Sequence, residues 1–452
     1  MKHSCHTVTQ RIMKIIPLFM VITITLNTGI ITKAAELNEN LRPFGEIIGR
    51  YDYMDNYDFN NTTNDKKETF YARTRLGLDF GFKHIGGRFQ IRDFRQSGDS
   101  LRNFPDKSNT KIREAYIDLI SIPLENMDIT IGRQEIAKGE ERILGSNDWH
   151  WIGYTHDAIS IAVKPTPYQK WSALFIKVGE SSVADGKTID NRAYVSGLYT
   201  SFFLKSFEKL ELYYFYQDYD SSTLPNLLPQ IVSSGSYGKD YKVHTFGLLT
   251  KLNITEKLFF GFEGNLQSGD FGTKNLESFL LHTKLGVETG VQEINSVILS
   301  YDIYSGDKDP NDNTINTYQP LFPSYYEHTG LIGWFGMKNL TDLRLNINGT
   351  IFSSLTWKID GHFFTVHRLE DGVYLPNNTL YNFVYTGYSS PSIPTSNDLG
   401  REVDIILSLP LIKDMSLTAT SSFLEPGKYV EDSFGCKGGT NTHFTIGVKW
   451  RF

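Results

Sequence analysis

The sequence predicts an all-β protein, a transmembrane antiparallel β-barrel of about 18 strands. Three observations predict this fold: apolar and polar residues alternate along many segments, these segments are long, and aromatic residues gather near their ends. The final segment, THFTIGVKWRF, shows the alternation most clearly. Because side chains alternate across a strand, one face of this segment carries Phe444, Ile446, Val448, Trp450 and Phe452.

The same alternation recurs at several places along the chain, in residues 70–83, 258–267, 342–348 and 355–360. In the first of these segments Leu76 and Leu78 lie on the apolar face, whereas Arg73 and Arg75 lie on the opposite face. Alternation alone also fits a soluble β-sandwich, whose core face is apolar and whose other face meets water.

Length and aromatic placement favour a membrane barrel over a sandwich. The alternating segments reach about 10 residues, whereas strands of soluble proteins average about 5–6. Aromatic residues crowd the ends of predicted strands, as in outer-membrane barrels, at residues 211–219, 324–328 and 449–452. Hydrocarbon offers the backbone no hydrogen-bond partner, so strands can span it only as a closed cylinder.

The barrel size follows from the chain length. At about 23 residues per strand, with its share of turn and loop, about 420 residues give about 18 strands, the range in which the lumen holds water. Segments 265–272 and 305–313 contain Gly and Asn and are expected to be turns or loops.

Residues 1–34 have the pattern of a secretory signal. Arg11 and Lys14 precede an apolar run over 15–31, and Ala34 and Ala35 follow as a small-residue cleavage region. The alternative is an N-terminal membrane anchor, although polar residues dilute the apolar run. We therefore expect a signal peptide over 1–34 and a single barrel domain over 35–452.

Composition excludes several classes of protein. A hydrophobic content of 40% is too low for a bundle of membrane helices. Without residues 1–34 the chain has 41 basic and 51 acidic residues, a formal charge of −10, so a nucleic-acid partner is not expected. Only Cys436 remains, so the domain has no internal disulfide.

The last strand ends on an aromatic residue, Phe452. An apolar strand face that ends in a C-terminal Phe is typical of the signal that the outer-membrane barrel assembly machinery recognises. The alternative is an ordinary edge strand at the end of the chain. We expect the outer membrane of a Gram-negative-type bacterium, contact with its lipid, and recognition by that machinery.

Three blocks of sequence resemble the alginate-export-type outer-membrane proteins. Residues 301–344 share YD, SGD, DP and LFP elements with that family, and residues 400–427 resemble its closing hairpin. Within the block over 132–163 the match falls on Gly132, Arg133, Gln134, Gly139, Arg142, Asp148, Trp149, Gly153 and Asp157. The chain departs from the family pattern at Tyr154, at His156 and over 324–326, which bears on the substrate.

The resemblance implies an 18-stranded barrel. In alginate exporters the lumen is lined with arginines and conducts an anionic polysaccharide. It therefore implies an alginate-export-like channel here, without fixing the solute.

Charged side chains within alternating strands are expected to line the lumen. A Lys or Arg facing lipid near the midplane costs about 2–4 kcal/mol, which favours the inward orientation. The cationic candidates for solute contact are Arg73, Arg75, Arg88, Arg92, Arg344 and Lys358. The acidic candidates are Glu114, Asp118, Glu263, Asp360, Glu402 and Asp404. The alternative is that these residues form inward ion pairs that brace a wide cylinder.

Arg133 does not fit this scheme, because it shares its strand phase with Ile129 and Ile131. That phase directs Arg133 toward lipid. It must lie either above the apolar band or beyond a bulge.

Other chemistry is weak in this sequence. Asp307 and Asp309 have the spacing of calcium ligands, although Pro310 and the missing glycine argue against such a loop. The default is a solvated acidic loop. No catalytic motif or metal-binding His pattern is present, so we expect neither an enzyme nor a cofactor.

The favoured hypothesis is a porin-like channel for diffusion or export of a hydrophilic solute, anionic or sugar-like, or of an acidic polysaccharide. The alternatives are a barrel with enzymatic or adhesive loops and a secreted soluble glycan-binding β protein.

Overall fold

The computed structural model describes residues 40–60, 65–98, 110–178, 193–204, 207–219, 241–376, 380–381, 395–434 and 439–452. The expected signal peptide and Cys436 lie outside these residues. No helix among the described residues is long and apolar enough to cross a membrane.

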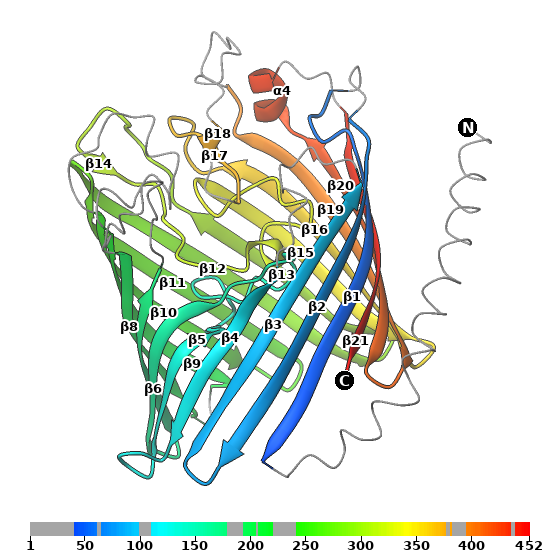
Figure 1. Ribbon diagram of the computed structural model, residues 1–452. Helices are drawn as coiled ribbons and strands as arrows, with labels where there is room; N and C mark the ends of the chain where they lie inside the picture. The colour runs from blue at the N-terminus through cyan, green and yellow to red at the C-terminus, as the bar shows by residue number, and fades with distance from the viewer. Residues whose placement is uncertain are drawn as a thin grey trace, which may run out of the picture.

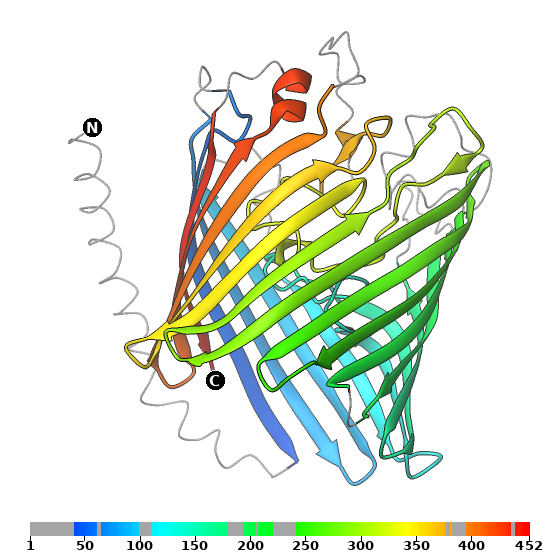
Figure 2. The same cartoon turned by 180° about the vertical axis from the view of Figure 1, so that it is seen from behind.

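Eighteen strands form a closed antiparallel barrel, as predicted (Figures 1 and 2). They are β1 (Leu41–Asp55), β2 (Lys67–Phe82), β3 (Ile85–Gly98), β4 (Lys111–Ile120), β5 (Met127–Gln134), β6 (His156–Thr166), β7 (Gln169–Lys177), β8 (Ala193–Phe202), β9 (Lys209–Tyr219), β10 (Tyr241–Asn253), β11 (Leu258–Phe271), β12 (Lys274–Val291), β13 (Ile294–Tyr304), β15 (Leu340–Ile351), β16 (Leu355–Val366), β19 (Asp398–Ile412), β20 (Met415–Pro426) and β21 (Asn441–Arg451).

Each strand pairs with its neighbour in the chain, and β21 pairs with β1 to close the barrel. Glu46 of β1 lies opposite Arg451, and Asp55 lies opposite Thr442. This seam leaves the sheet without a free edge. The short strand β14 (Thr314–Ile315) adds to β12, β17 (Val373–Tyr374) pairs with β18 (Leu380–Tyr381), and helix α4 (Lys428–Phe434) follows β20.

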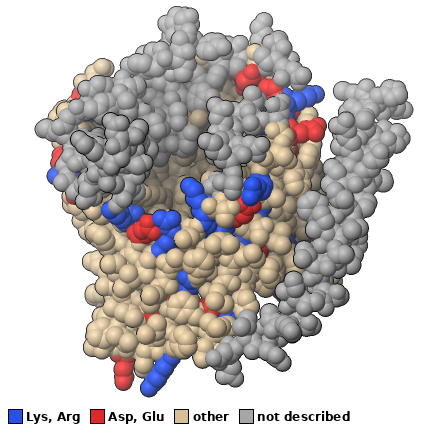
Figure 3. All heavy atoms as spheres, in the orientation of Figure 1, with Lys and Arg blue, Asp and Glu red and all other residues tan. Residues whose placement is uncertain are grey.

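Paired residues show how the alternation builds the two faces of the wall. One row of paired positions is apolar and carries the exposed side chains of Leu285, Leu299, Leu345, Val403 and Phe423, with Gly361 of β16 between Leu345 and Val403. The row one residue away points inward and contains Lys284, Ser300, Arg344, His362 and Glu402. Figure 3 shows a mostly tan outer wall above charged groups at the lower edge.

The two ends of the barrel differ in the length of their connections. Two-residue turns such as 83–84 and 413–414 lie at the end that carries the C-terminus, whereas long connections such as 135–155 and 305–339 lie at the other end. Short turns mark the periplasmic end of outer-membrane barrels, and long loops mark the extracellular end.

The predicted break at 265–272 is mostly wrong. Strand β11 continues through this segment to Phe271, and the chain turns only at Gly272, whose φ is +64°. The alternation continues there, since Asn265 and Gln267 are buried and Leu266 is exposed. Gly and Asn are accommodated inside this strand because the paired neighbours supply its hydrogen bonds.

Two long connections turn back into the barrel, and we call them the first lumen segment (135–155) and the second lumen segment (305–339). The backbone N–H of Gly145 donates to the carbonyl of Phe322 at 2.7 Å. The hydroxyl of Ser324 accepts from the N–H of Asn147 at 2.7 Å and donates to Glu141 Oε2 at 2.6 Å. The two segments therefore hold each other inside the lumen.

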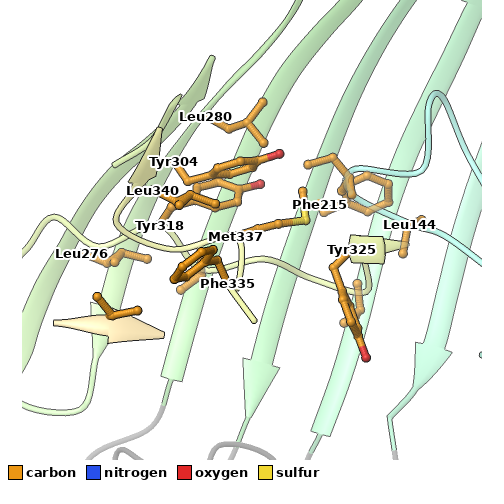
Figure 4. Close-up of a cluster of buried hydrophobic side chains, with 14 of the residues drawn as sticks. Leu144, Phe215, Leu276, Leu280, Tyr304, Tyr318, Tyr325, Phe335, Met337 and Leu340 are labelled. Carbon is orange, nitrogen blue, oxygen red and sulfur yellow. The ribbon is translucent and has the colours of Figure 1, made fainter. Parts of the chain in front are cut away.

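The main apolar cluster lies between these segments and one side of the wall (Figure 4). Phe215 of β9 and Tyr304 of β13 point inward toward Leu144, Phe335 and other buried residues of the lumen segments. Burial of apolar surface stabilises this contact by roughly 25 cal/mol per Å². The lumen is thus filled along the wall from β8 to β13.

We predict that Leu345→Arg destabilises the folded barrel by about 2–4 kcal/mol, because it places a guanidinium in hydrocarbon near the middle of β15. Folding into lipid vesicles as a function of urea concentration measures this change. Leu345→Phe is the matched control and should stay near the wild type. Equal stability of the two variants would contradict the outward assignment of this row.

Candidate functional site: the arginine-lined lumen

Arginines gather on the inner face of β2, β3 and β4. Arg73 and Arg75 leave only 2% and 6% of their surface exposed, and Arg92 and Arg113 are equally buried. They share one face because residues two apart in a strand point the same way. Strands β2 to β4 face strands β11 to β13 across the barrel (Figure 1).

Two carboxylates hold the arginine pair. Arg73 donates to Glu46 of β1 at 2.7 Å, and Arg75 Nη2 donates to Asp148 of the first lumen segment at 2.6 Å. Asp148 also lies 3.3 Å from Arg73. Both arginines are therefore shared between a wall acid and a segment acid.

Asp148 stays ionised in this position. Burial alone would raise the pKa of Asp148, but the charges of Arg73 and Arg75 hold the pKa below its usual value. The contact is therefore present above the ordinary carboxyl pKa of about 3.9 and is lost only as the pH falls below it.

Further contacts tie the first lumen segment to the same wall. Arg113 donates to Glu135, and Arg92 donates to the carbonyl of Ile152 at 2.9 Å.

Arg113 was not among the predicted lumen residues. Gln90 of β3 pairs with Glu114 whereas the next residue of β3 pairs with residue 112, so the register shifts at Arg113.

This shift is a β-bulge, and it turns two consecutive charged residues, Arg113 and Glu114, toward the lumen. Strict alternation would direct one of them toward lipid. Two adjacent charges within a spanning strand were the sequence signal for this bulge.

The first lumen segment also sends one arginine to the opposite side. Arg142 is buried and lies 3.0 Å from Glu140, 3.3 Å from Asp302 and 3.7 Å from Glu263. Burial would lower the pKa of Arg142, but these acids hold the pKa above its usual value. Lys284 donates to Glu140. Arg142 of the family motif therefore anchors the first lumen segment to this side of the wall.

The predicted acids of β19 hold the second lumen segment. Glu402 and Asp404 are fully buried and accept the backbone N–H groups of Ile332 at 2.9 Å and Leu331 at 3.2 Å. Gly330 precedes this contact with a φ of +86°, and a Cβ there would lie 2.5 Å from Glu402. A glycine is required for this close approach.

Other predicted lumen residues pair with one another on the wall. Arg344 and Lys358 each lie 2.7 Å from Asp360. Arg88 donates to Asp79 at 2.7 Å and to Glu114 at 3.3 Å, and Asp118 accepts the hydroxyl of Thr130 at 2.6 Å. These are inward pairs of the bracing kind.

Sequence reasoning missed the inward His–Asp pairs. His282 lies 2.8 Å from Asp302, and His362 lies 2.7 Å from Asp342. All four residues are buried on the inner face, but pairing across strands is not visible in one sequence.

The remaining family-motif residues lie at the outer end of β5 and β6 and in the first lumen segment. Arg133 forms an exposed ion pair with Asp157 at 2.6 Å at the extracellular end of β5. An exposed ion pair at a strand end is compatible with the first of the two expected positions, above the apolar band. Gln134 points inward and donates to the carbonyl of Ala158 at 3.2 Å. The backbone φ of Gly132 is +127°, and a Cβ there would lie 2.3 Å from a carbonyl oxygen.

Trp149 follows Asp148 and lines a cavity beside β1, β2 and β3. The guanidinium carbon of Arg50 lies 5.0 Å from the centre of its ring. The motif therefore places a charge and an aromatic ring side by side on one segment.

The acidic loop considered for calcium follows β13. Asp307 accepts the backbone N–H of Asp309 at 3.2 Å, and Asp309 accepts that of Asn311 at 3.1 Å. Among the residues the structure describes, no group of three His, Cys, Asp or Glu side chains could hold a metal ion. Calcium at Asp307 and Asp309 stays a prediction.

Solved outer-membrane proteins share this architecture. OccK2 (OpdF) of Pseudomonas aeruginosa in complex with glucuronate gives a TM-score of 0.59 at 10% identity, covering 92% of this chain and 98% of that one. OccK5 (OpdH) of the same organism gives 0.56 at 9%, covering 91% and 98%. The outer membrane protein opdK of Pseudomonas aeruginosa gives 0.57 at 9%, covering 91% and 99%. At these identities the similarity shows the fold alone.

No curated protein sequence matches the chain. The model of the Alginate export family matches residues 45–441. Together with the closed barrel of 18 strands, this match confirms the predicted location in the outer membrane. The chain belongs to the Alginate export family and is a porin-like channel of the outer membrane.

Proposed function

We propose that this channel passes a hydrophilic, anionic solute of the carbohydrate type, a uronate sugar or an acidic polysaccharide, and that Arg73 and Arg75 select it. The observation that carries the proposal is the contact of these two buried arginines with the carboxylate of Asp148, 2.6 Å from Arg75. An arginine pair that binds a carboxylate of the protein has the geometry to bind a carboxylate of a solute.

The surrounding charges suit passage rather than permanent binding. Arg92 and Arg113 lie on the next two strands and extend the positive field along the wall, while Glu46 and Glu114 interrupt it. Cationic side chains draw anions into a pore, and interspersed acids keep the anion from being trapped.

The comparisons support the solute class. The matched family is described by alginate export, and one structure of the same fold binds glucuronate. Glucuronate is a sugar acid and alginate is a polymer of sugar acids. The carboxylates of both compounds fit an arginine pair.

Family and fold point to a transport porin rather than an enzyme. A secreted soluble β protein is excluded by the outer-membrane location. The barrel contacts outer-membrane lipid. We also propose that the assembly machinery recognises the C-terminal strand, whose Phe452 exchanges backbone hydrogen bonds with Gly45 beside the closing seam.

We predict that replacing both Arg73 and Arg75 with Gln lowers the anion-to-cation permeability ratio at least threefold, because it removes two buried positive charges from the lumen. The measurement is the reversal potential of the purified protein in a planar bilayer under a potassium chloride gradient. Arg133→Gln removes an outward arginine and is the control. A cation-selective wild type, or an unchanged ratio in the double variant, would refute the proposed selection.

We predict that Asp148→Asn strengthens the binding of an anionic solute to the lumen. Removing this carboxylate leaves Glu46 as the acid shared by the arginine pair, so glucuronate should block the channel current with at least threefold higher affinity. Asp309→Asn makes the same charge change on the acidic loop after β13 and should leave the affinity unchanged. Weaker block by glucuronate in Asp148→Asn would mean that Asp148 serves the solute rather than competing with it.

A further inference from the structure

A cavity lies on the extracellular side of the arginine pair. It opens between β1, β2, β3 and β21 on the wall and the tips of both lumen segments. The inward residues of β2 are, from its extracellular end, Lys67, Thr69, Tyr71, Arg73 and Arg75. The first three line the cavity and the last two form the pair. A solute on this side of the lumen meets both in sequence.

Aromatic rings form much of the cavity lining. Tyr71 and Phe94 project from adjacent strands, and the ring of Trp151 stacks on both, with centroid distances of 4.5 Å and 5.7 Å. The guanidinium carbon of Arg50 lies 4.2 Å from the centre of the Trp151 ring and 5.0 Å from that of Trp149. The rings and the charge form one ordered stack.

Polar groups surround this stack. Asp52 accepts two hydrogen bonds from Arg50, at 2.6 Å and 2.7 Å, which fixes the guanidinium over the rings. His443 Nε2 lies 3.7 Å from Asp52, and Lys67 lines the cavity beside them. Cationic side chains therefore outnumber the one carboxylate of the lining.

The stack also helps to hold the first lumen segment against the wall. This structural role alone does not explain the exposure of the rings or the composition of the cavity lining. Trp149 and Trp151 stay partly exposed rather than fully buried. The space beside them is bounded by apolar side chains such as Met54 and Leu331 together with the charged side chains of Arg50, Asp52 and Lys67. Binding sites for small molecules combine apolar surface with a few placed polar groups in this way.

We propose that this cavity binds one sugar ring of an acidic saccharide. One face of a pyranose consists of C–H bonds, which pack against the flat face of an indole ring, and its hydroxyl and carboxylate groups project outward to polar partners. Trp149 and Trp151 supply the aromatic surface. Arg50 and Lys67 face the carboxylate, and Asp52 accepts hydroxyl protons.

This inference rests on the proposed function and adds a subsite that recognises the sugar ring. The arginine pair recognises charge, whereas the aromatic cavity recognises the carbon skeleton. The two sites lie in series on the same strand, so they contribute separately to affinity and to ion selectivity.

The test uses the purified full-length channel with trigalacturonate, an acidic trisaccharide, and maltotriose, a neutral one. Binding is followed by tryptophan fluorescence and by block of single-channel current, and anion preference is followed by the reversal potential. Trp149→Ala removes one ring. Met54→Trp fills the cavity from β1 without removing a ring. Trp171→Phe, on the exposed outer side of β7, is the control.

We expect trigalacturonate to bind the wild type at least tenfold more tightly than maltotriose. Both cavity variants should weaken this binding at least fivefold, Met54→Trp should keep the anion preference of the wild type, and Trp171→Phe should match the wild type throughout. Should Trp149→Ala fail to fold, Met54→Trp together with the wild type carries the test.

Three results would overturn the subsite: no saturable binding of trigalacturonate, equal affinity for maltotriose, or unchanged affinity in Met54→Trp. A wild-type channel without anion preference would instead overturn the proposed function. The fluorescence titration separates these two failures, because it does not depend on ion flow.

Discussion

The closing of the sheet between β21 and β1 is the constraint on which the rest of the structure depends. Hydrocarbon provides no hydrogen-bond partner, so every backbone group of a spanning strand must be satisfied by a neighbouring strand. The seam from Glu46 and Arg451 to Asp55 and Thr442 meets this requirement for the last pair of strands. Once the sheet is closed, each residue of a strand has only two directions, lipid or lumen.

That division explains why so much charge is buried. The row Leu285, Leu299, Leu345, Val403 and Phe423 covers the outside, so charged residues of the same strands can only point inward. Inside, many are held by partners rather than by water, as Arg73 is by Glu46 and Arg142 by Asp302. Removing one partner of such a pair leaves a buried charge and is costly. The lumen segments thus supply counter-charges as well as apolar contacts.

The sequence was sufficient to predict the parts of the structure that depend on local pattern. The alternation around Leu76 and Arg75 predicted a barrel wall and its inner face, because orientation in a strand is set by position alone. The bulge at Arg113 broke that pattern, so its inward side chain was missed. The course of the lumen segments could not be predicted either. It depends on contacts such as Ser324 with Glu141, which join residues far apart in the chain.

The candidate site could be predicted only in part from the sequence. Arg73 and Arg75 were identified by strand phase, and Asp148 by resemblance, but nothing in the chain said that they touch. Because they are in contact, the three residues must be considered as one site. A buried arginine pair without an acid would hold an anion tightly and release it slowly, whereas a neighbouring carboxylate offers the pair an alternative partner. Under the proposed function, a solute carboxylate exchanges with Asp148 while Glu46 stays in contact with both arginines, and this exchange of partners is what we propose permits passage.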